Sequence, residues 1–481
     1  MATTDRARAG LVIVGAGIAG IGLAIRLKRA GLDDFVVLEA GDDVGGVWRD
    51  NVYPGVACDI PRGLYSYSFL PQPASPTTYA SGGEIHDYLR DAVASEGLEP
   101  HLRLAEPMRS ACWQERDRCW TVHTRRGTLE ATVLVVAAGR QSTPLVPAVP
   151  GLDTYPGRAF HSSRWDARPL TGLRVGVVGT GASAVQLLPH VAAEAAETIV
   201  FQRTPAWVLP REGDSAASTT ERSRGDLAAE AESLYEARIH DSEAAGALAA
   251  RALTHLRRQV PDPLLREQLT PDYEIGCKRA VFSDDYFPTL QLPQVTLEPS
   301  ALARVDGSAA IAASGRSYAL DAIVFATGFD TANPAYAAGV SGRGGRTLAE
   351  HWAGTMRTYA STAVHGFPNM FVMGGPNAAL GHNSAIEVLE TQMDYILGAV
   401  AHLAEADAQL EVSPEAERDY LRLVDRLAAD TVWTRGGCTS WYLDGSSRRP
   451  SLLWPAPAAE FRRRYGAFDP TPYTTAYARG R

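Results

Sequence analysis

Two glycine-rich turns in this chain are each followed by a charged residue, and the two charges have opposite sign. GAGIAG at residues 15–20 is followed by Glu39, and GTGASA at residues 179–184 is followed at the same distance by Arg203. Glycines in this pattern let the backbone approach a pyrophosphate and point helix N-terminal amides at its charge. An acidic side chain after the next strand accepts hydrogen bonds from a free ribose, whereas an arginine there suits a 2′-phosphate. The two turns therefore predict two dinucleotides, with Glu39 holding the ribose of FAD and Arg203 selecting NADPH.

Short apolar segments flank both turns, as strands of a βαβ unit should. Residues 11–14 and 35–38 frame the first turn, and residues 173–178 and 198–202 frame the second. An ordinary strand-turn-helix without a nucleotide stays open as the alternative, more so for the second turn, where Ala184 replaces the last glycine. The residues expected to contact nucleotide at the two turns are Gly15, Gly17, Gly20, Gly179, Thr180, Gly181, Ser183 and Gln186.

Length and composition limit the class of protein. A chain of 481 residues exceeds a single core and predicts two or three domains. Its net charge of -9 argues against a nucleic-acid partner. The apolar run 11–27 contains glycines and charges that fit a strand-turn-helix, and no other stretch could span a bilayer, so we expect a soluble cytoplasmic protein. The scattered cysteines disfavour a disulfide framework, a zinc site and a dithiol reductase: Cys58, Cys112, Cys119, Cys277 and Cys438.

Further strands are predicted between and after the two turns. Residues 120–124 and 129–132 are typical of a hairpin that leads into a buried strand at 133–136. That strand ends beside Ala138, in a run of small residues where the backbone can approach a cofactor. The same device recurs where a strand at residues 322–325 is followed by small residues at 326–328. Two strands that end in small residues suit two nested nucleotide-binding folds.

The remaining segments are mostly helical by pattern. Residues 212–275 are rich in Ala, Glu, Arg and Leu with apolar positions at helical spacing, and we interpret their alternating charge as a solvated face without a catalytic role. A helix is expected at 386–403. Another should begin after Ser413, which can cap it, with Pro414 in its first position.

These elements predict an α/β protein with two nested Rossmann-like domains and a helical insertion. Residues 1–148 and 333–481 would form the FAD-binding domain, and residues 149–211 and 276–332 the NADPH-binding domain. Residues 212–275 would be the helical insertion.

Two longer motifs resemble those of a known family. YPGRAFHSSRWD at residues 155–166 resembles the Baeyer-Villiger monooxygenase fingerprint FxGxxxHxxxW(P/D), with Tyr155 in place of the first Phe. Related flavin monooxygenases that oxidise nitrogen or sulfur usually have Tyr and a basic residue where this chain has Trp165 and Asp166. GGVWRDNVYPGVACD at residues 45–59 resembles the family pattern GGxWxxxxYPGxxxD throughout.

The resemblance implies two catalytic residues. Arg279 resembles the arginine that stabilises a flavin C4a-peroxide anion, and Asp59 resembles the carboxylate that positions it. A guanidinium is always charged, so it suits an oxygen species that must stay deprotonated to attack a carbonyl carbon. A turn-capping Asp59 and a surface ion pair at Arg279 are the structural alternatives.

Other residues take expected roles from the same resemblance. His161 is as consistent with a hinge as with proton transfer. For Trp48, Tyr65 and Trp441, the alternative is aromatic packing without contact to a cofactor. The expected FAD contacts are Gly46, Val47, Trp48, Asp59, Tyr65 and Asn377; the expected NADPH contacts are Arg203, Thr204, Lys278 and Trp441; the expected hinge residues are Gly157, His161, Trp165 and Asp166.

The function implied is an FAD- and NADPH-dependent monooxygenase. It would insert one oxygen atom from O2 beside a ketone carbonyl, through a C4a-peroxyflavin, and give an ester or lactone. Oxidation of an amine nitrogen or a thioether sulfur is the first alternative, and an NADPH-flavin reductase or oxidase without oxygen insertion is the second. A flavin-binding sensor without enzymatic activity is the non-enzyme alternative. The sequence indicates no metal site, and it predicts neither the substrate nor the oligomeric state.

Overall fold

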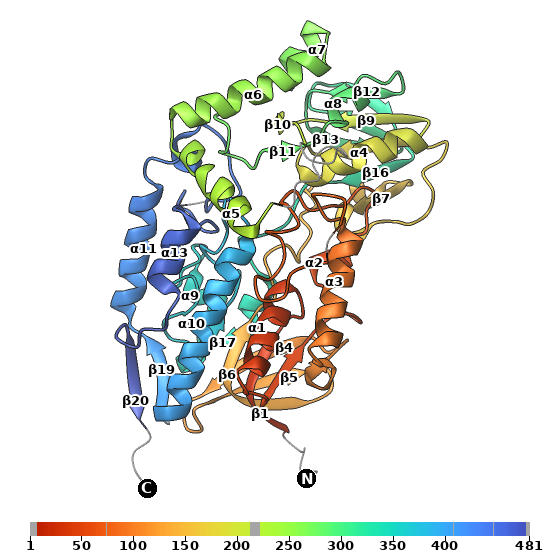
Figure 1. Ribbon diagram of the computed structural model, residues 1–481. Helices are drawn as coiled ribbons and strands as arrows, with labels where there is room; N and C mark the ends of the chain where they lie inside the picture. Colours follow the sequence, from red (N-terminus) through yellow and green to blue (C-terminus); the bar gives the residue numbers. More distant parts are fainter. Residues whose placement is uncertain (1–6, 74, 212–221, 407, 446, 478–481) are drawn as a thin grey trace.

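The computed structural model describes residues 7–73, 75–211, 222–406, 408–445 and 447–477. Two sheets with parallel centres form its core, one in the lower half of Figure 1 and one at the upper right, with helices from the middle of the chain at the top. The first described strand, β1 (Ala7–Val14), and the last, β20 (Tyr473–Tyr477), both lie in the lower half of Figure 1.

The larger sheet is parallel at its centre and antiparallel on one side. Its strands follow the order β17 (Val340–Ser341), β4 (Met108–Gln114), β5 (Cys119–Thr124), β6 (Thr128–Val136), β1 (Ala7–Val14), β2 (Phe35–Leu38) and β3 (Leu102–Arg103), and β18 (Met370–Val372) also pairs with β6. Val14 is opposite both Leu38 and Val136 in the parallel register. The carboxyl ends of β1, β2 and β6 therefore meet at one edge, where the first glycine-rich turn begins.

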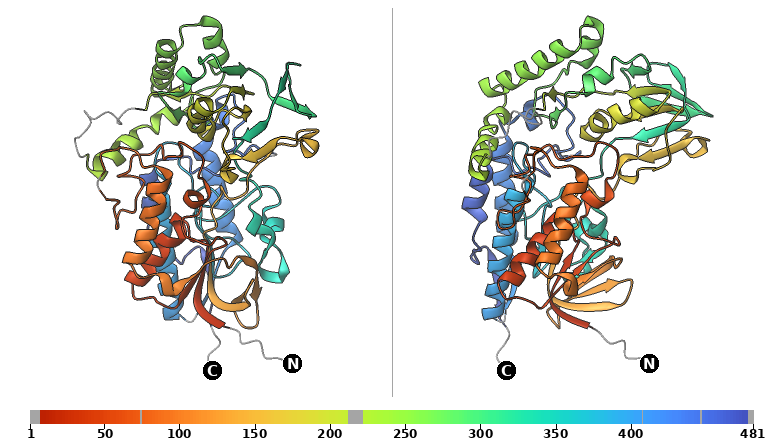
Figure 2. Two further views of the ribbon diagram at one scale, coloured as in Figure 1. Left: turned by 90° about the vertical axis from the view of Figure 1, so that its right-hand side faces the viewer. Right: turned by 45° about the vertical axis from the view of Figure 1, so that its right-hand side comes forward.

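Side chains along β1 point alternately into two cores, one on each face of this sheet. Leu11 and Ile13 pack into the core under α1 (Ile18–Arg29), α3 (Gly82–Ser95) and α10 (Ala385–Ala406), whereas Val12 and Val14 pack into a second core on the other face. Successive strand side chains point to opposite faces, so a strand buried on both faces is apolar throughout. Figure 2 shows α1, α3 and α10 side by side on one face.

The second sheet is parallel throughout. Its order is β12 (Val295–Glu298), β9 (Glu197–Phe201), β8 (Arg174–Val178), β16 (Ala322–Phe325) and β7 (Arg158–His161), with α4 (Ala182–Glu194) packed against it and an antiparallel group, β13 (Leu302–Asp306), β14 (Ala309–Ala312) and β15 (Ser317–Ala319), nearby. Val178 is level with Phe201 and Phe325, so the second glycine-rich turn also starts at the carboxyl edge of a parallel sheet.

Helices occupy the described part of the stretch that the sequence assigns to them. They are α5 (Arg224–Ser233), α6 (Glu243–Gln259) and α7 (Pro263–Leu269), with the short turn η4 (Glu236–Arg238) between the first two. Arg224, the first residue of α5, connects this helix to α10 of the larger sheet, because its Nη2 donates to Glu387 at 2.6 Å. Residues 212–221 of the expected insertion lie outside the described residues.

Further helices follow α10 in the chain, and the last of them packs against it. They are α11 (Pro414–Ala428), α12 (Val432–Arg435) and α13 (Ala458–Tyr465), and β19 (Ala408–Val412) pairs with β20 (Tyr473–Tyr477) below them. The Ser413 side chain accepts a hydrogen bond from the Ala416 amide, which confirms the predicted cap. The short elements α2 (Val47–Asp50), α8 (Tyr286–Thr289), α9 (Leu348–Trp352), β10 (Val208–Leu209) and β11 (Val281–Phe282) complete the regular structure used below.

The fold class predicted from the sequence is confirmed, and so is the hairpin that pairs Trp120 with Ala131. The expectation about cysteines is wrong for one pair, because Cys277 and Cys438 form a disulfide with their Cα atoms 6.1 Å apart. Their separation of 161 residues hides this contact from any spacing rule. Among the described residues, Cys58, Cys112 and Cys119 take no part in a disulfide.

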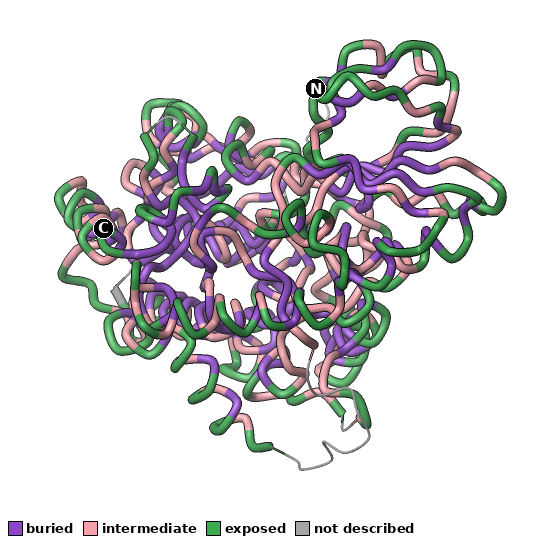
Figure 3. Tube along the Cα trace, turned by 90° about the horizontal axis from the view of Figure 1, so that it is seen from above, coloured by how far each residue is buried: buried purple, intermediate pink, exposed green. Residues whose placement is uncertain are grey.

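Buried residues follow the central strands, and exposed residues follow the outer loops and helix faces (Figure 3). Among the described residues, no helix combines the length and the apolarity needed to cross a bilayer.

Candidate active site

At two glycines of the first turn, a side chain would collide with the backbone. Gly15 has φ +107°, and a Cβ there would lie 2.6 Å from the Ala137 carbonyl oxygen; a Cβ on Gly20 would lie 1.9 Å from the Gly15 oxygen. At Gly17, by contrast, the nearest atom to an added Cβ is the Gly46 Cα at 3.7 Å. The turn is therefore tight on its strand side and open beside Gly17, which is the shape that a phosphate needs.

Glu39 is placed at the end of β2 by three hydrogen bonds. Its Oε2 accepts from the Ala16 amide at 2.8 Å, and its Oε1 accepts from the Gly41 amide at 2.7 Å and from Arg49 Nη1 at 2.8 Å. The carboxylate is 6% exposed and keeps lone pairs free for ribose hydroxyls. Arg49, which the sequence reasoning did not single out, forms an ion pair with this buried carboxylate.

The motif at residues 45–59 continues from this turn. Gly46 has φ +55° and begins α2, which carries Val47 and Trp48. Trp48 Nε1 donates to Tyr65 Oη at 3.2 Å, and the rings meet edge to face with centroids 5.4 Å apart. Both side chains are partly buried. Ala138, just after β6, is also partly buried.

The second turn has the same division into a tight side and an open side. Gly179 has φ +122°, and a Cβ there would lie 2.4 Å from the Ala326 oxygen, whereas nothing lies within 4 Å of an added Cβ at Gly181. Thr180 Oγ1 donates to the Thr204 carbonyl oxygen at 2.8 Å, so the Thr180 hydroxyl holds the turn against the next strand end. Ala184 is 1% exposed and packs in the core, which accounts for a methyl group in place of the last glycine.

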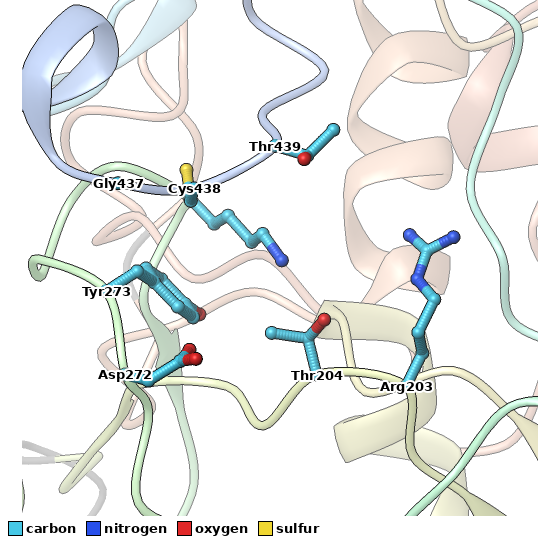
Figure 4. Close-up of a pocket in the computed structure, with 8 residues that line it drawn as sticks. Arg203, Thr204, Asp272, Tyr273, Gly437, Cys438 and Thr439 are labelled. Carbon is cyan, nitrogen blue, oxygen red and sulfur yellow. The ribbon is translucent and has the colours of Figure 1, made fainter.

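Arg203, Thr204 and Lys278 line one pocket of about 440 Å³. Lys278 Nζ lies 4.8 Å from the centroid of the Tyr273 ring. Burial lowers the pKa of Lys278, and the charge of Arg203 lowers it further. Within the described parts of the chain, neither cation forms an ion pair with a carboxylate, so the pocket presents two free positive charges. Figure 4 shows the rest of the lining: Asp272, Tyr273, Gly437, Cys438 and Thr439.

The Arg279 guanidinium and the Asp59 carboxylate form a two-point ion pair. Nε donates to Oδ2 at 2.9 Å and Nη2 donates to Oδ1 at 2.6 Å, although the residues are 220 positions apart in the chain. The side chains are 29% and 21% exposed. Asp59 raises the pKa of Arg279 by Coulomb attraction, and the attraction outweighs the cost of burial at Asp59, whose pKa is lowered. The pair is thus ionised on both sides and lines a cavity of about 790 Å³.

Gln186 connects the two sheets. Tyr53 Oη donates to Gln186 Oε1 at 2.9 Å, and Gln186 Nε2 donates to the Ala57 carbonyl oxygen at 3.0 Å. Tyr53 and Ala57 belong to the motif that ends at Asp59, and Gln186 belongs to α4 of the second sheet. The side chain expected to touch a nucleotide therefore also holds the Asp59 loop against the other half of the molecule.

The linker motif is built mainly by packing. A Cβ on Gly157 would lie 2.6 Å from the Asp321 carbonyl oxygen, so only glycine fits there. Trp165 meets Phe160 edge to face at 5.3 Å. Asp166 pairs with Arg158 at 3.0 Å, and neither residue is part of the described lining of the cavity of about 790 Å³.

His161 is enclosed and neutral. It is 3% exposed, its Nδ1 accepts from the Ser163 amide at 3.1 Å, and its buried Nε2 has no hydrogen-bond partner among the described residues. Burial lowers the pKa of His161. A histidine held in this way supports the hinge interpretation over proton transfer.

Asn377 and Trp441 lie in different surroundings. Asn377 is fully buried, and its Nδ2 donates to the carbonyl oxygens of Pro450 and Leu453 at 2.9 and 3.0 Å. Trp441 is 40% exposed and stacks on Tyr442 at 4.6 Å. The first side chain is committed to a loop of its own chain, whereas the second is available at the surface.

Sequence reasoning missed Arg238. It lies in the stretch interpreted as a solvated face, and that interpretation is wrong for this residue, which is 7% exposed and lines the same cavity as Arg279 and Asp59. It stands between Ala237 and Ile239 in a stretch of alternating charge, and no local pattern marks the arginine itself as buried.

The residues present fit both predicted cofactors. Open space beside Gly17 and Gly181 is where a pyrophosphate can approach backbone amides, and Glu39 and the Arg203–Lys278 pocket supply the acid and the cations that distinguish the two adenosine riboses.

Comparison with known proteins agrees with this geometry. Residues 12–224 match the pyridine nucleotide-disulphide oxidoreductase family. A Baeyer-Villiger monooxygenase of Streptomyces coelicolor is 42% identical over 478 residues, which cover 96% of this chain and 92% of the relative. Among solved structures, a steroid monooxygenase bound to NADP has a TM-score of 0.85 and 30% identity, over 98% of this chain and 100% of that one.

The structure of OTEMO in complex with FAD and NADP has a TM-score of 0.85 at 26% identity and covers 97% of this chain and 99% of that one. Two glycine-rich turns, the Arg279–Asp59 pair and similarity over nearly the full chain lead to one assignment. The chain belongs to the Baeyer-Villiger monooxygenases, which use FAD, NADPH and O2 to insert oxygen.

Proposed function

We propose that Arg279 and Asp59 form the oxygen-inserting centre and that the substrate is a ketone. One atom of O2 would enter the substrate beside its carbonyl group and the other would leave as water, with NADPH supplying two electrons. Bound FAD would supply the activation of O2. The observation that carries the proposal is the two-point pair of Arg279 and Asp59 at the cavity.

The protein's part in this reaction is to place charge. The Arg279 guanidinium would stabilise negative charge on oxygen, because it cannot give up its proton at neutral pH. A unit charge about 4 Å away contributes roughly 4 kcal/mol at an effective dielectric constant near 20. Asp59 fixes the plane of the guanidinium and leaves Nη1 without a protein acceptor among the described residues. That free donor is the group offered to the reacting oxygen.

Binding of the two nucleotides would follow the two sheets. Segments 1–148 and 333–481 would hold FAD through the Gly15 turn and Glu39, and segments 149–211 and 276–332 would hold NADPH through the Gly179 turn. Arg203 and Lys278 would pair with the 2′-phosphate, and the Thr204 hydroxyl would donate to it.

The test is product analysis with Arg279→Ala and Arg279→Lys. Wild-type enzyme should convert a ketone panel to esters or lactones, whereas Arg279→Ala should lose product and keep flavin reduction by NADPH, because the charge acts after reduction. Arg279→Lys should recover part of the yield. Sulfoxide from sulfides with no ester from any ketone would refute the ketone assignment, and an unchanged yield in Arg279→Ala would remove Arg279 from the reaction.

A further inference from the structure

A second buried arginine faces the cavity of the Arg279–Asp59 pair. Arg238 is the last residue of η4 in the helical stretch and is 7% exposed. It lines the cavity of about 790 Å³ together with Arg279. The two guanidinium groups are close enough that the charge of Arg279 lowers the pKa of Arg238.

Arg238 has no carboxylate partner among the described residues. Its Nε donates to the Gly381 carbonyl oxygen at 3.2 Å and its Nη1 to the Ala237 carbonyl oxygen at 3.3 Å, whereas its Nη2 donates to no protein atom in the described ranges. Four other arginines of the cavity do have ion pairs: Arg62 with Glu84, Arg222 with Glu230, Arg224 with Glu387 and Arg279 with Asp59.

This arrangement leaves a positive charge without compensation inside the protein. Burial and the neighbouring Arg279 lower the pKa of Arg238 to about 10, so the group stays protonated at neutral pH. Buried charges in proteins are normally paired, because the cost of removing an ion from water is large. The missing anion can reach Arg238 from the cavity that its side chain lines.

The cavity has both polar and apolar walls, and several large apolar side chains line it. They include Leu64, Leu209, Leu227, Leu234, Leu248 and Phe282. A ligand that contacts these side chains has a hydrocarbon body. Among the polar groups of the same lining, Arg238 and the Arg279–Asp59 pair are the charged groups that would bind its polar ends. A site of this kind fixes a ligand by two polar ends.

We propose, on the basis of the proposed function, that Arg238 is a specificity-determining residue that binds a carboxylate of the substrate. The substrate class is then an aliphatic or alicyclic ketone that carries a carboxylate on a hydrocarbon body, with its carbonyl group toward Arg279. The two-donor geometry of a guanidinium suits a carboxylate in this position.

The experiment compares an alicyclic ketone that bears a carboxymethyl group with the methyl ester of the same compound. FAD-loaded wild type, Arg238→Met, Arg238→Lys and Arg222→Met are assayed with both. Arg222 is the matched control, since it lines the same cavity but has Glu230 as partner and a side chain that is 47% exposed. The readouts are kcat and KM for each compound and the dissociation constant from the flavin absorbance change, which needs no turnover.

Wild type should prefer the acid, and Arg238→Met should lower the acid-to-ester ratio of kcat/KM about 30-fold or more, mainly through KM. Arg238→Lys should recover part of the ratio, and Arg222→Met should leave it within about twofold of wild type, as for a paired surface charge. A non-ketone cyclohexane carboxylate should compete with the acid in wild type, and its amide should not, so the inference is testable even where Arg238→Met fails to fold.

Three results would overturn the inference. The first is equal use of acid and ester by wild type. The second is an equal loss of kcat/KM for both compounds in Arg238→Met, which indicates a purely structural role through the contact with Gly381. The third is a changed FAD dissociation constant in Arg238→Met with an unchanged acid-to-ester ratio, which assigns the charge to the cofactor. Failure of the proposed function looks different, because no ketone then yields an ester while the carboxylate still binds in the absorbance titration.

Discussion

Replacement of Asp59 by asparagine tests the ion pair at the centre of the site. The substitution keeps the size of the side chain and removes its charge, so Arg279 keeps one hydrogen-bond acceptor and loses its counter-ion. At about 3 Å and an effective dielectric constant near 20, the Coulomb attraction is roughly 5–6 kcal/mol before desolvation. With contacts of 2.6 and 2.9 Å and side chains 29% and 21% exposed, we expect a net loss of about 2–4 kcal/mol in the positioning of Arg279.

The assay separates the two halves of the reaction. Anaerobic reduction of the flavin by NADPH should change by less than about threefold, whereas oxygenation should slow by about 30-fold to several hundredfold, because each 1.4 kcal/mol is a factor of ten. Where NADPH is consumed without formation of ester, its electrons should reduce O2 to hydrogen peroxide. Yield of ester, NADPH consumption and peroxide are measured in the same reaction.

Asp321→Asn is the matched control. Asp321 forms the same two-point pair with Arg174, at 3.0 and 2.8 Å, but at the surface of the second sheet and outside the cavity lining. It should leave the partition between ester and peroxide unchanged. Coupled oxygenation by Asp59→Asn at the wild-type rate would refute the reasoning, and so would an equal loss in the two variants.

Acid should act on the same pair. The folded state lowers the pKa of Asp59, so its contribution to the free energy of unfolding is complete above the ordinary pKa of an aspartate, about 3.9. That contribution is lost as the pH falls below this value toward the lowered pKa, and Asp59→Asn should lack this part of the acid destabilisation. Urea unfolding midpoints of both proteins between about pH 3 and 6 measure the difference.

The other predictions concern the nucleotide pocket and the disulfide. Arg203→Ala should raise KM for NADPH by about 10- to 100-fold with little change for NADH, since only NADPH carries the 2′-phosphate; equal effects on the two would contradict its role. Burial and Arg203 lower the pKa of Lys278, so the affinity for NADPH should begin to fall at a lower pH than it would with an ordinary lysine in this position. Lys278→Arg should move that fall to higher pH, and identical pH profiles of wild type and Lys278→Arg would contradict this role. Replacing Cys277 and Cys438 by serine should lower the free energy of unfolding by about 3–5 kcal/mol, as expected for a long closed loop, and thiol titration of denatured wild type should find only the other cysteines reactive before reduction.

Local features of the molecule follow from neighbouring residues. The glycine turns at Gly15 and Gly179, the cap at Ser413 and the hairpin at β5 and β6 each depend on residues a few positions apart. The backbone conformation, hydrogen bonds and strand alternation that build them are local, so the sequence alone predicts them. The same holds for Glu39 and Arg203, whose places are set by the βαβ unit that carries them.

Pairing across the chain was decided by tertiary structure. Arg279 meets Asp59 across 220 positions, Cys277 meets Cys438 across 161, and Gln186 meets Tyr53 across 133. Family resemblance implied the first of these contacts, and nothing in the residue spacing implied the others. Arg238 shows the limit of sequence reasoning most clearly, because an arginine in a stretch of alternating charge has the pattern of a surface position. Only the packing of the helical stretch over the cavity takes its guanidinium out of water.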